Sequence, residues 1–406
     1  MPIEPRSPGV PGEPSRPART LRKSLSRIGL AVVGFTVAVL LAEAALRLFT
    51  DEGPSSTVRD AVVSRRYLRA FEARVRVEES GRTVLLRFNR DGFRGPDRPL
   101  AKPAGVRRVA VLGDSMVAAV GIDEERTFVA LAEGRLSNGT EPANTEVMNF
   151  GVAGSSPGIE SILYEAVVSQ YAPDVVLCAW FAGNDFGDDC AAIGGRRQVA
   201  YDLDAEDRLV RRPLEAATPV LSEWLAQHSR FYIWQKSVLA RIRPDDAAAG
   251  GPRPGLRVYD TGADADLARG WKIQEAILEH LAGAVRARGS KFALVMLPEA
   301  AQVYDDVWRD AMNTVGPTAD SYDAGHPGRR LAGIAARLGV PFLDLTPAFR
   351  AAAPHASVAR KDEWLFLNGT GHLDDAGHRV AADALTPFLA GLLAPDASSP
   401  SKPDGR

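Results

Sequence analysis

The residue of this chain with the clearest chemical potential is Ser115, in the sequence Gly113-Asp114-Ser115. An apolar run at 109–112 ends abruptly at this triplet, which predicts a buried strand followed by a turn and a helix. A serine at such a junction presents its hydroxyl at the carboxyl edge of a parallel sheet, beside a helix N-terminus that favours a developing negative charge. Ser115 is therefore a candidate nucleophile. The alternative is that Asp114 and Ser115 only cap the helix, since both residue types favour that position.

A serine nucleophile needs donors that hold an oxyanion. Gly154 follows a second apolar run at 147–150, where the lack of a side chain lets a backbone N–H approach a ligand. Asn184 follows a third run at 174–181 and can direct its amide N–H toward the same point. Together with the backbone N–H of Ser115, these residues form the predicted oxyanion hole. Taken singly, Gly154 could instead serve a tight turn and Asn184 a helix cap.

The predicted general base is His372, one of six histidines. It falls in a loop just before the last predicted helix, from which it can reach Ser115. His378 is the nearest competitor, but it falls in the first turn of that helix, where a surface or capping role is more common. The other histidines lie in amphipathic helical stretches or in loops without a supporting motif: His228, His280, His326 and His355.

Four short blocks in this order resemble those of the SGNH (GDSL-type) hydrolases. The blocks are Gly113-Asp114-Ser115, Asn149-Phe150-Gly151-Val152-Ala153-Gly154, Gly183-Asn184-Asp185 and Gly371-His372-Leu373. The resemblance implies a flavodoxin-like SGNH fold and a serine esterase that needs no metal or organic cofactor. It also implies catalytic roles for Ser115 and His372, with Ser115, Gly154 and Asn184 as oxyanion donors. The N-x-x-G-F-R segment at 89–94 is similar to one that precedes the domain in membrane-anchored, extracytoplasmic members.

Two positions depart from the family pattern. Ala182 stands where the third block usually has glycine. Gly369 stands where the family usually carries aspartate three residues before the histidine, so the acid of a triad is missing from its usual place. Asp362, Asp374 or a backbone carbonyl could replace it, or the site could act as a Ser–His dyad. A catalytically degenerate member of the family is the alternative that this departure leaves open.

The elements that must hold these residues alternate between apolar strands and helices. This pattern predicts an α/β protein, a three-layer α/β/α sandwich around a doubly wound parallel sheet of about five strands. We place this domain at 106–393, with a helical, aromatic-bearing insertion at about 186–270. The insertion could form a lid or substrate platform, or its aromatic residues could simply pack helices onto the sheet. Residues 50–105 form an N-terminal extension and linker with a strand or two.

The apolar segment at 28–49 is long enough to cross a bilayer as a helix. Its basic N-terminal flank predicts a single-pass topology with a cytoplasmic N-terminus and an extracytoplasmic catalytic domain, periplasmic or at the cell surface. A cleaved signal peptide with a small-residue site near 42–45 and a buried core helix are the alternatives to a retained anchor. The tails at 1–27 and 394–406 have compositions typical of disorder.

The charge balance limits the partners of the chain. With 406 residues, 49 basic and 51 acidic side chains and a net charge of -2, the composition argues against nucleic acid and against a disordered chain. The sequence therefore predicts a serine esterase that acts on a small ester or an acylated glycan outside the cytoplasm. An O-acyltransferase for cell-surface or exported polysaccharide, and a carbohydrate-binding protein that has lost the chemistry, are the alternatives.

Overall fold

The computed structural model describes most of the chain. The described residues are 16–49, 56–60, 62–77, 80–138, 144–195, 199–214, 220–242, 254–355, 357, 364–367 and 371–394. Residues 1–15 and 395–406, which make up much of the tails predicted at 1–27 and 394–406, lie outside these residues, as do Asp362 and Gly369.

Five parallel strands form the central sheet, in the order β11-β10-β7-β5-β6. Their bounds are β5 (Arg107–Gly113), β6 (Thr145–Gly151), β7 (Val175–Phe181), β10 (Lys291–Leu297) and β11 (Phe342–Asp344). Within this sheet the first strand in chain order, β5, is flanked by the second and the third, β6 and β7. This is the doubly wound, flavodoxin-like order, whose switch point lies beside the first strand. The predicted fold class is confirmed.

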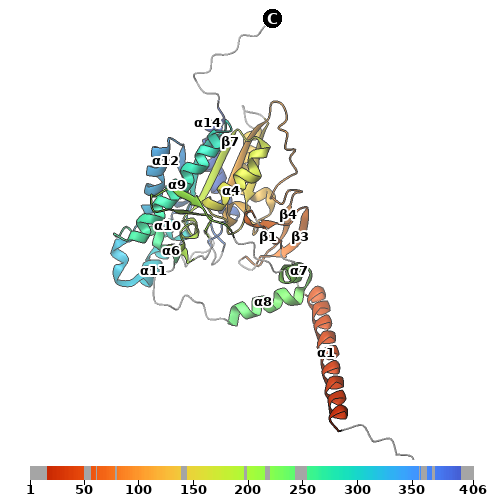
Figure 1. Ribbon diagram of the computed structural model, residues 1–406. Helices are drawn as coiled ribbons and strands as arrows, with labels where there is room; N and C mark the ends of the chain where they lie inside the picture. Colours follow the sequence, from red (N-terminus) through yellow and green to blue (C-terminus); the bar gives the residue numbers. More distant parts are fainter. Residues whose placement is uncertain are drawn as a thin grey trace, which may run out of the picture.

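Helices cover both faces of the sheet (Figure 1). One apolar core lies under α4 (Pro157–Ala166), α9 (Ala265–Arg286) and α12 (His326–Leu338). The other lies under α3 (Phe128–Asn138), α13 (Thr346–Ala352) and α14 (Asp375–Leu393). Successive side chains of β5 alternate between the two cores, since neighbouring strand residues point to opposite faces. Shorter elements complete the domain: α2 (Ser115–Ala118), η1 (Glu124–Arg126), η2 (Val168–Tyr171), α10 (Ala300–Val303), α11 (Asp305–Val315) and η5 (Gly316–Ser321).

The N-terminal extension is more ordered than the sequence predicts. It contains two antiparallel hairpins, β1 (Thr57–Asp60) with β2 (Ser64–Tyr67) and β3 (Phe71–Arg76) with β4 (Thr83–Phe88). Buried side chains of the second hairpin and of Val77, which follows β3, pack on the α/β domain, where Val77 and Val84 meet Ile122 and Leu367. The extension is therefore part of the folded domain and not a linker along its whole length.

The predicted insertion is not purely helical. It contains α5 (Asp185–Asp188), α6 (Ala191–Gly194), α7 (Val220–His228), α8 (Arg230–Ile242) and η4 (Pro254–Tyr259), but also a hairpin of β8 (Tyr201–Leu203) and β9 (Leu209–Arg211). The side chain of Asp204 accepts the backbone N–H groups of Glu206 and Arg208 and so closes the hairpin turn. The helix α9, which covers the sheet, already begins inside the predicted insertion.

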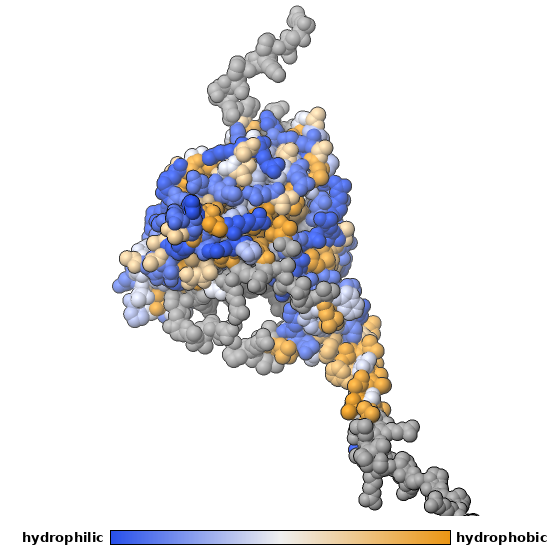
Figure 2. Space-filling view, viewed as in Figure 1, coloured by the Kyte–Doolittle hydropathy of each residue, from blue (hydrophilic) through white to orange (hydrophobic). Residues whose placement is uncertain are grey.

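The N-terminal helix α1 spans Arg16–Phe49, so the stretch 16–27 is helical and not part of a disordered tail. Extending a formed helix by one residue costs little, and this stretch is rich in Arg, Lys, Leu and Ala, which favour helix. Its segment Arg27–Phe49 is long and apolar enough to cross a membrane, and none of the apolar window is buried. The core-helix alternative is therefore wrong. Figure 2 shows this apolar segment of α1 projecting away from the domain.

Candidate active site

Ser115 is the first residue of α2, directly after the C-terminal end of β5. Asp114 caps this short helix, because its carboxylate accepts the backbone N–H of Met116 at 2.8 Å. Two glycines permit the close packing of this turn. A Cβ at Gly113 would collide with the Val117 side chain, and a Cβ at Gly151 would collide with the backbone N of Ala118. The strand, turn and helix predicted around Ser115 are present.

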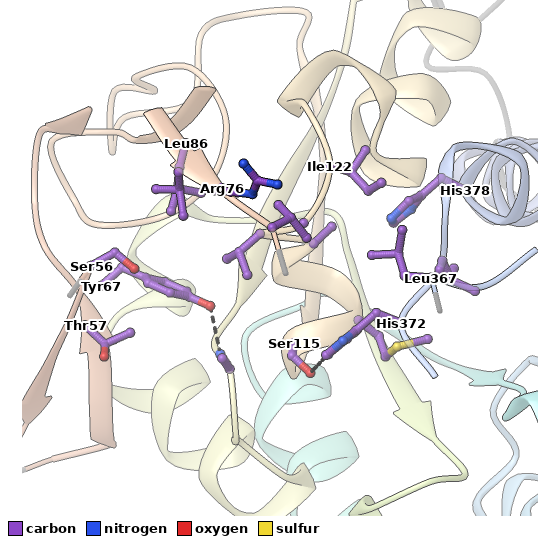
Figure 3. A pocket seen from close by; sticks show the side chains of 18 residues that line it. Ser56, Thr57, Tyr67, Arg76, Leu86, Ser115, Ile122, Leu367, His372 and His378 are labelled. Carbon is purple, nitrogen blue, oxygen red and sulfur yellow. Dashed lines mark hydrogen bonds between the residues drawn. The ribbon is translucent and has the colours of Figure 1, made fainter. Parts of the chain in front are cut away.

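His372 meets Ser115 across the sheet edge. The distance between His372 Nε2 and Ser115 Oγ is 2.9 Å, as the dashed line in Figure 3 shows. The backbone fixes the histidine in place, since the N–H of Leu367 donates to the carbonyl of His372 at 2.7 Å. The N–H of Leu365 in turn donates to the hydroxyl of Tyr304 at 2.8 Å. His372, the predicted base, is thus joined by a backbone hydrogen bond to the segment 364–367, which Tyr304 holds in turn.

His378 has a different environment. Its side chain is buried, and Nδ1 accepts the backbone N–H of Phe128 at 3.1 Å. Burial lowers the pKa of His378 to about 3, so the ring is neutral at physiological pH and can serve as this acceptor. The bond joins the first turn of α14 to α3, which is a structural role.

The two sequence candidates for an acid partner of His372 have different outcomes. Asp362 lies outside the described residues. Asp374 caps α14, where its carboxylate accepts the backbone N–H of Gly377 at 2.7 Å. Partial burial raises the pKa of Asp374. The structure thus gives Asp374 a helix-capping role, and the acid partner stays a prediction.

Gly154 lies in the loop after β6, with φ at +75°, a conformation that favours glycine. The loop is tied to the nucleophile turn, because the Val152 N–H and the Ser155 hydroxyl both donate to the carbonyl of Gly113, at 2.9 and 3.0 Å. Its other side is held by the N-terminal extension, where the Ala153 N–H donates to the Tyr67 hydroxyl at 3.2 Å. The predicted oxyanion glycine therefore sits on a loop anchored at the serine.

Asn184 is the N-cap residue of α5, directly after β7. Its amide donates to Asp188 Oδ2 at 2.8 Å, and a hydrogen bond from Asn184 to Asp114 lowers the pKa of that carboxyl. Burial acts in the opposite direction and is stronger, so the pKa of Asp114 is raised to about 7. The third block is thus connected to the first through side chains.

Sequence reasoning missed a group of buried acids beneath the site. Glu160, Asp185 and Asp189 are all buried, and burial raises the pKa of each, that of Asp189 to about 6. Asp189 accepts the Ser156 hydroxyl at 2.5 Å, and Asp185 accepts the Phe181 N–H at 2.8 Å. These hydrogen bonds hold the segments that follow β6 and end β7. Only Asp185, as part of the third block, had a sequence signal.

Arg94 is a further residue to which the sequence assigned no role. Its buried guanidinium donates to the carbonyls of Ala119 and Ile122, at 3.1 and 2.8 Å. Ala119 has φ at +47°, which is uncommon for a residue with a Cβ, so this bond helps to hold a strained turn just after α2. The N-x-x-G-F-R segment at 89–94 carried the signal, and the structure gives it this physical role.

A cavity of about 350 Å³ opens beside Ser115 and His372. Figure 3 shows Tyr67, Arg76 and Leu86 from the N-terminal hairpins facing Ile122 and Leu367 across it. The aromatic helices α7 and α8 are not among the elements that line this cavity, and α8 contacts α1. Among the described residues, no group of three or more His, Cys, Asp or Glu side chains is arranged to hold a metal ion.

No family model matches the chain, and no curated protein matches it. Among solved structures, an acetyl xylan esterase, AlAXEase, is similar at 17% identity with a TM-score of 0.38, covering 70% of this chain and 99% of that one. TesA is similar at 16% identity with a TM-score of 0.37, over 71% and 100%. A variant of Axe2, an acetylxylan esterase from Geobacillus stearothermophilus, gives 16% and 0.35, over 70% and 94%.

Proposed function

We propose that this protein is a serine ester hydrolase of the SGNH type. The observation that carries the proposal is the 2.9 Å contact between His372 Nε2 and Ser115 Oγ, at the carboxyl edge of a doubly wound sheet. A hydroxyl at a strand-to-helix turn, with an imidazole in hydrogen-bonding distance, has the arrangement that nucleophilic catalysis requires. The anchored loop of Gly154 supports the oxyanion part of the proposal. The amide of Asn184 donates to Asp188 in this structure, and it becomes an oxyanion donor when it turns toward the substrate.

In the first half-reaction, Ser115 Oγ attacks the carbonyl carbon of the ester while neutral His372 Nε2 takes the hydroxyl proton. The N–H groups of Ser115 and Gly154 and the amide of Asn184 stabilise the oxyanion of the tetrahedral intermediate. The bond from the carbonyl carbon to the alcohol oxygen then breaks. His372 returns its proton to that oxygen, and the acyl group remains on Ser115 as an ester.

In the second half-reaction, water replaces the alcohol. His372 takes a proton from the water, whose oxygen attacks the acyl carbon and forms a second oxyanion. The bond between that carbon and Ser115 Oγ breaks, His372 protonates the serine, and a carboxylic acid leaves. The catalytic groups are restored without a metal or an organic cofactor.

Hydrolysis of 4-nitrophenyl esters by the purified full-length protein tests this proposal. We expect turnover that Ser115→Ala abolishes and that Ser137→Ala leaves unchanged, because Ser137 lies in α3 and donates to the carbonyl of Thr145, away from the site. Absence of turnover in the intact protein, or equal turnover with Ser115→Ala, would overturn it.

An acylated glycan is the substrate that we propose. Ser56, Thr57 and the exposed Arg76 add polar groups to the lining of the site cavity, and these suit the hydroxyl groups of a sugar. Acyl esters of glucose and of cellobiose, compared with acyl esters of simple alcohols, test this choice. A lower KM for the sugar esters is expected, and an equal KM would contradict it.

We propose further that α1 is a retained anchor that keeps the catalytic domain outside the cytoplasm. The support is Glu43, whose carboxylate accepts the N–H groups of Arg230 and Phe231 and the hydroxyl of Ser229, at 2.9–3.0 Å. Cleavage near 42–45 would separate Glu43 from the domain and leave the N-terminus of α8 without this cap. Membrane fractions should contain the full-length chain, with the domain open to external protease; a soluble, shortened chain would contradict the proposal.

A further inference from the structure

The cavity beside Ser115 is apolar over most of its lining, and the N-terminal hairpins supply one of its walls. Val75, Val77 and Leu86 face it from β3, its C-terminal end and β4. The opposite wall includes Ile122 and Leu367, and both are buried. Further residues of the lining are also apolar: Met116, Ala119, Val120, Ala153 and Leu373.

The two walls are firmly joined. Val77 and Val84 share an apolar cluster with Ile122 and Leu367. A second cluster joins Tyr67, Leu86 and Phe88 to Ala118, in the helix that begins at the nucleophile. Because close-packed interiors do not readily collapse, the space between the walls is a preformed site. An apolar group that enters it is removed from water without first ordering the protein.

The volume of the cavity limits the size of the apolar group that it can hold. A cavity of about 150 Å³ lined by apolar side chains holds benzene. The cavity beside Ser115 measures about 350 Å³, which corresponds to roughly twice as many carbon atoms. An acetyl group would leave most of this apolar surface without a partner.

We propose that this cavity binds an aliphatic chain of the substrate, far longer than acetyl, next to the ester bond that Ser115 attacks. The inference rests on the proposed function and narrows its substrate class. In an acylated glycan this chain is the acyl group, and an aliphatic alcohol in the cavity is the alternative that the experiment separates. Each methylene that becomes buried in the cavity should raise kcat/KM by about fourfold, until the cavity is full.

Two series of ester substrates test the proposal. The full-length protein is reconstituted in lipid nanodiscs, which keep detergent out of the cavity. One series varies the acyl chain of 4-nitrophenyl esters from two to twelve carbons; the other varies the alcohol of acetate esters over the same range. We expect kcat/KM to rise by at least about tenfold with length in one of the series, which also tells which side of the ester the cavity holds. Flat profiles in both series would overturn the inference while leaving the hydrolase intact.

A variant that fills the cavity provides the matched comparison. Val75→Trp should lower kcat/KM for the preferred long ester about tenfold more than it lowers kcat/KM for the short ester. Arg74→Trp, exposed on the same strand and outside the cavity lining, is the control. If Val75→Trp does not fold, Val75→Phe replaces it. Should no ester be turned over, binding of an octanoate ester to Ser115→Ala protein, with and without Val75→Trp, still tests the cavity; equal affinity would refute it.

A second observation concerns α7 and α8, which lie at the end of α1 (Figure 1). Four of their exposed side chains are large and apolar: Leu221, Trp224, Trp234 and Leu239. His228, Gln235 and Lys236 of the same helices are exposed as well. Besides the bonds to Glu43, Arg47 of α1 donates to the carbonyl of His228 at 2.6 Å. The helix pair is thereby held beside the last two turns of the candidate membrane span.

We infer that α7 and α8 lie in the headgroup region of the bilayer and hold the domain against the membrane. Tryptophan prefers this region because one end of its ring system is polar, and an apolar helix face lying along the membrane buries area there. The inference rests on the retained anchor. It explains why these aromatic residues are exposed although they lie next to a folded domain.

Quenching of tryptophan fluorescence by brominated lipids in nanodiscs tests this placement. The segment Arg27–Phe49 contains no tryptophan, and Trp180 and Trp271 are buried in the domain. Trp308 and Trp364 are half-buried and pack on domain tyrosines, so the quenched signal should come from Trp224 and Trp234. We expect the double variant Trp224→Phe, Trp234→Phe to lose most of the quenching, whereas Trp308→Phe keeps it. Quenching that is absent, or that survives in the double variant, would overturn the inference.

Discussion

The imidazole of His372 and the hydroxyl of Ser115 lie 2.9 Å apart, although 257 positions separate the two residues in the chain. The pair forms because β5 ends at the nucleophile turn and because the loop before α14 is hydrogen-bonded to Leu365 and Leu367. Both partners thus sit on backbone that the fold fixes, and neither depends on a long flexible side chain for its position.

Replacing Arg94 should lower both stability and activity, although Arg94 does not contact Ser115 or His372. Arg94→Leu leaves the carbonyls of Ala119 and Ile122 without their charged donor, which should cost about 2–4 kcal/mol of stability and lower kcat. Thermal unfolding and ester hydrolysis measure the two effects. Arg87→Leu is the control, because the Arg87 ion pair with Glu72 is exposed and worth little. Equal stability and equal kcat in the two variants would argue against a role of Arg94 in holding the turn at 119–122.

The glycine at the end of β6 should tolerate no side chain. Gly151→Ala brings a methyl group into the backbone N of Ala118, so α2 must move, carrying Ser115 with it. We expect a loss of stability and a fall in kcat of at least about a hundredfold, because a displacement of about 1 Å is enough for this. Gly134→Ala, in the exposed interior of α3 with open space around it, should instead stabilise the protein by about 0.5–1 kcal/mol.

The bond between Tyr67 and the loop of Gly154 should matter for the rate. Tyr67→Phe keeps the ring and removes only the acceptor of the Ala153 N–H. Loss of an entire oxyanion donor costs about 10²–10³ in kcat, and a donor that is merely less well fixed should cost about tenfold. Steady-state kinetics should show this fall in kcat with little change in KM. Tyr322→Phe, remote from the site, should have no effect; a Tyr67→Phe enzyme with normal kcat would refute the positioning role.

The buried acids should make the fold less stable as the pH rises. The pKa of Asp185 is well above its ordinary value of 3.8 because burial disfavours the charged form. Its contribution to stability is therefore fully present below pH 3.8 and is lost as the pH rises through the folded-state pKa. Asp185→Asn removes this dependence. Above pH 4 the free energy of unfolding of the variant should therefore rise relative to that of the wild type by up to about 1.4 kcal/mol per pH unit.

Denaturant unfolding at several pH values measures this gain. The exposed carboxylate of Asp383 provides the control, and Asp383→Asn should leave the slope unchanged. A wild type and an Asp185→Asn variant whose stabilities run parallel from pH 5 to pH 8 would contradict the account.

The sheet was predictable because its strands are apolar runs that end at small or polar residues. For β7 the apolar run at 174–181 and the observed strand Val175–Phe181 differ by one residue. The hairpins of the extension were harder to predict, because β2 and β3 contain several arginines and owe their burial to the domain that they pack on. The cavity depends on that same long-range packing. Likewise, Arg94 gains a partner only when the turn at 119–122 forms beneath it.

Labelling with a fluorophosphonate probe, followed by mass spectrometry of the modified peptide, tests the central claim most directly. The probe reacts with a serine only when a neighbouring base and oxyanion donors activate it. We expect a single adduct on Ser115, none in Ser115→Ala, and labelling slowed by about a thousandfold in His372→Ala. An intact, folded protein that takes up no probe, or one whose labelling survives in Ser115→Ala, would show that this serine is not the nucleophile.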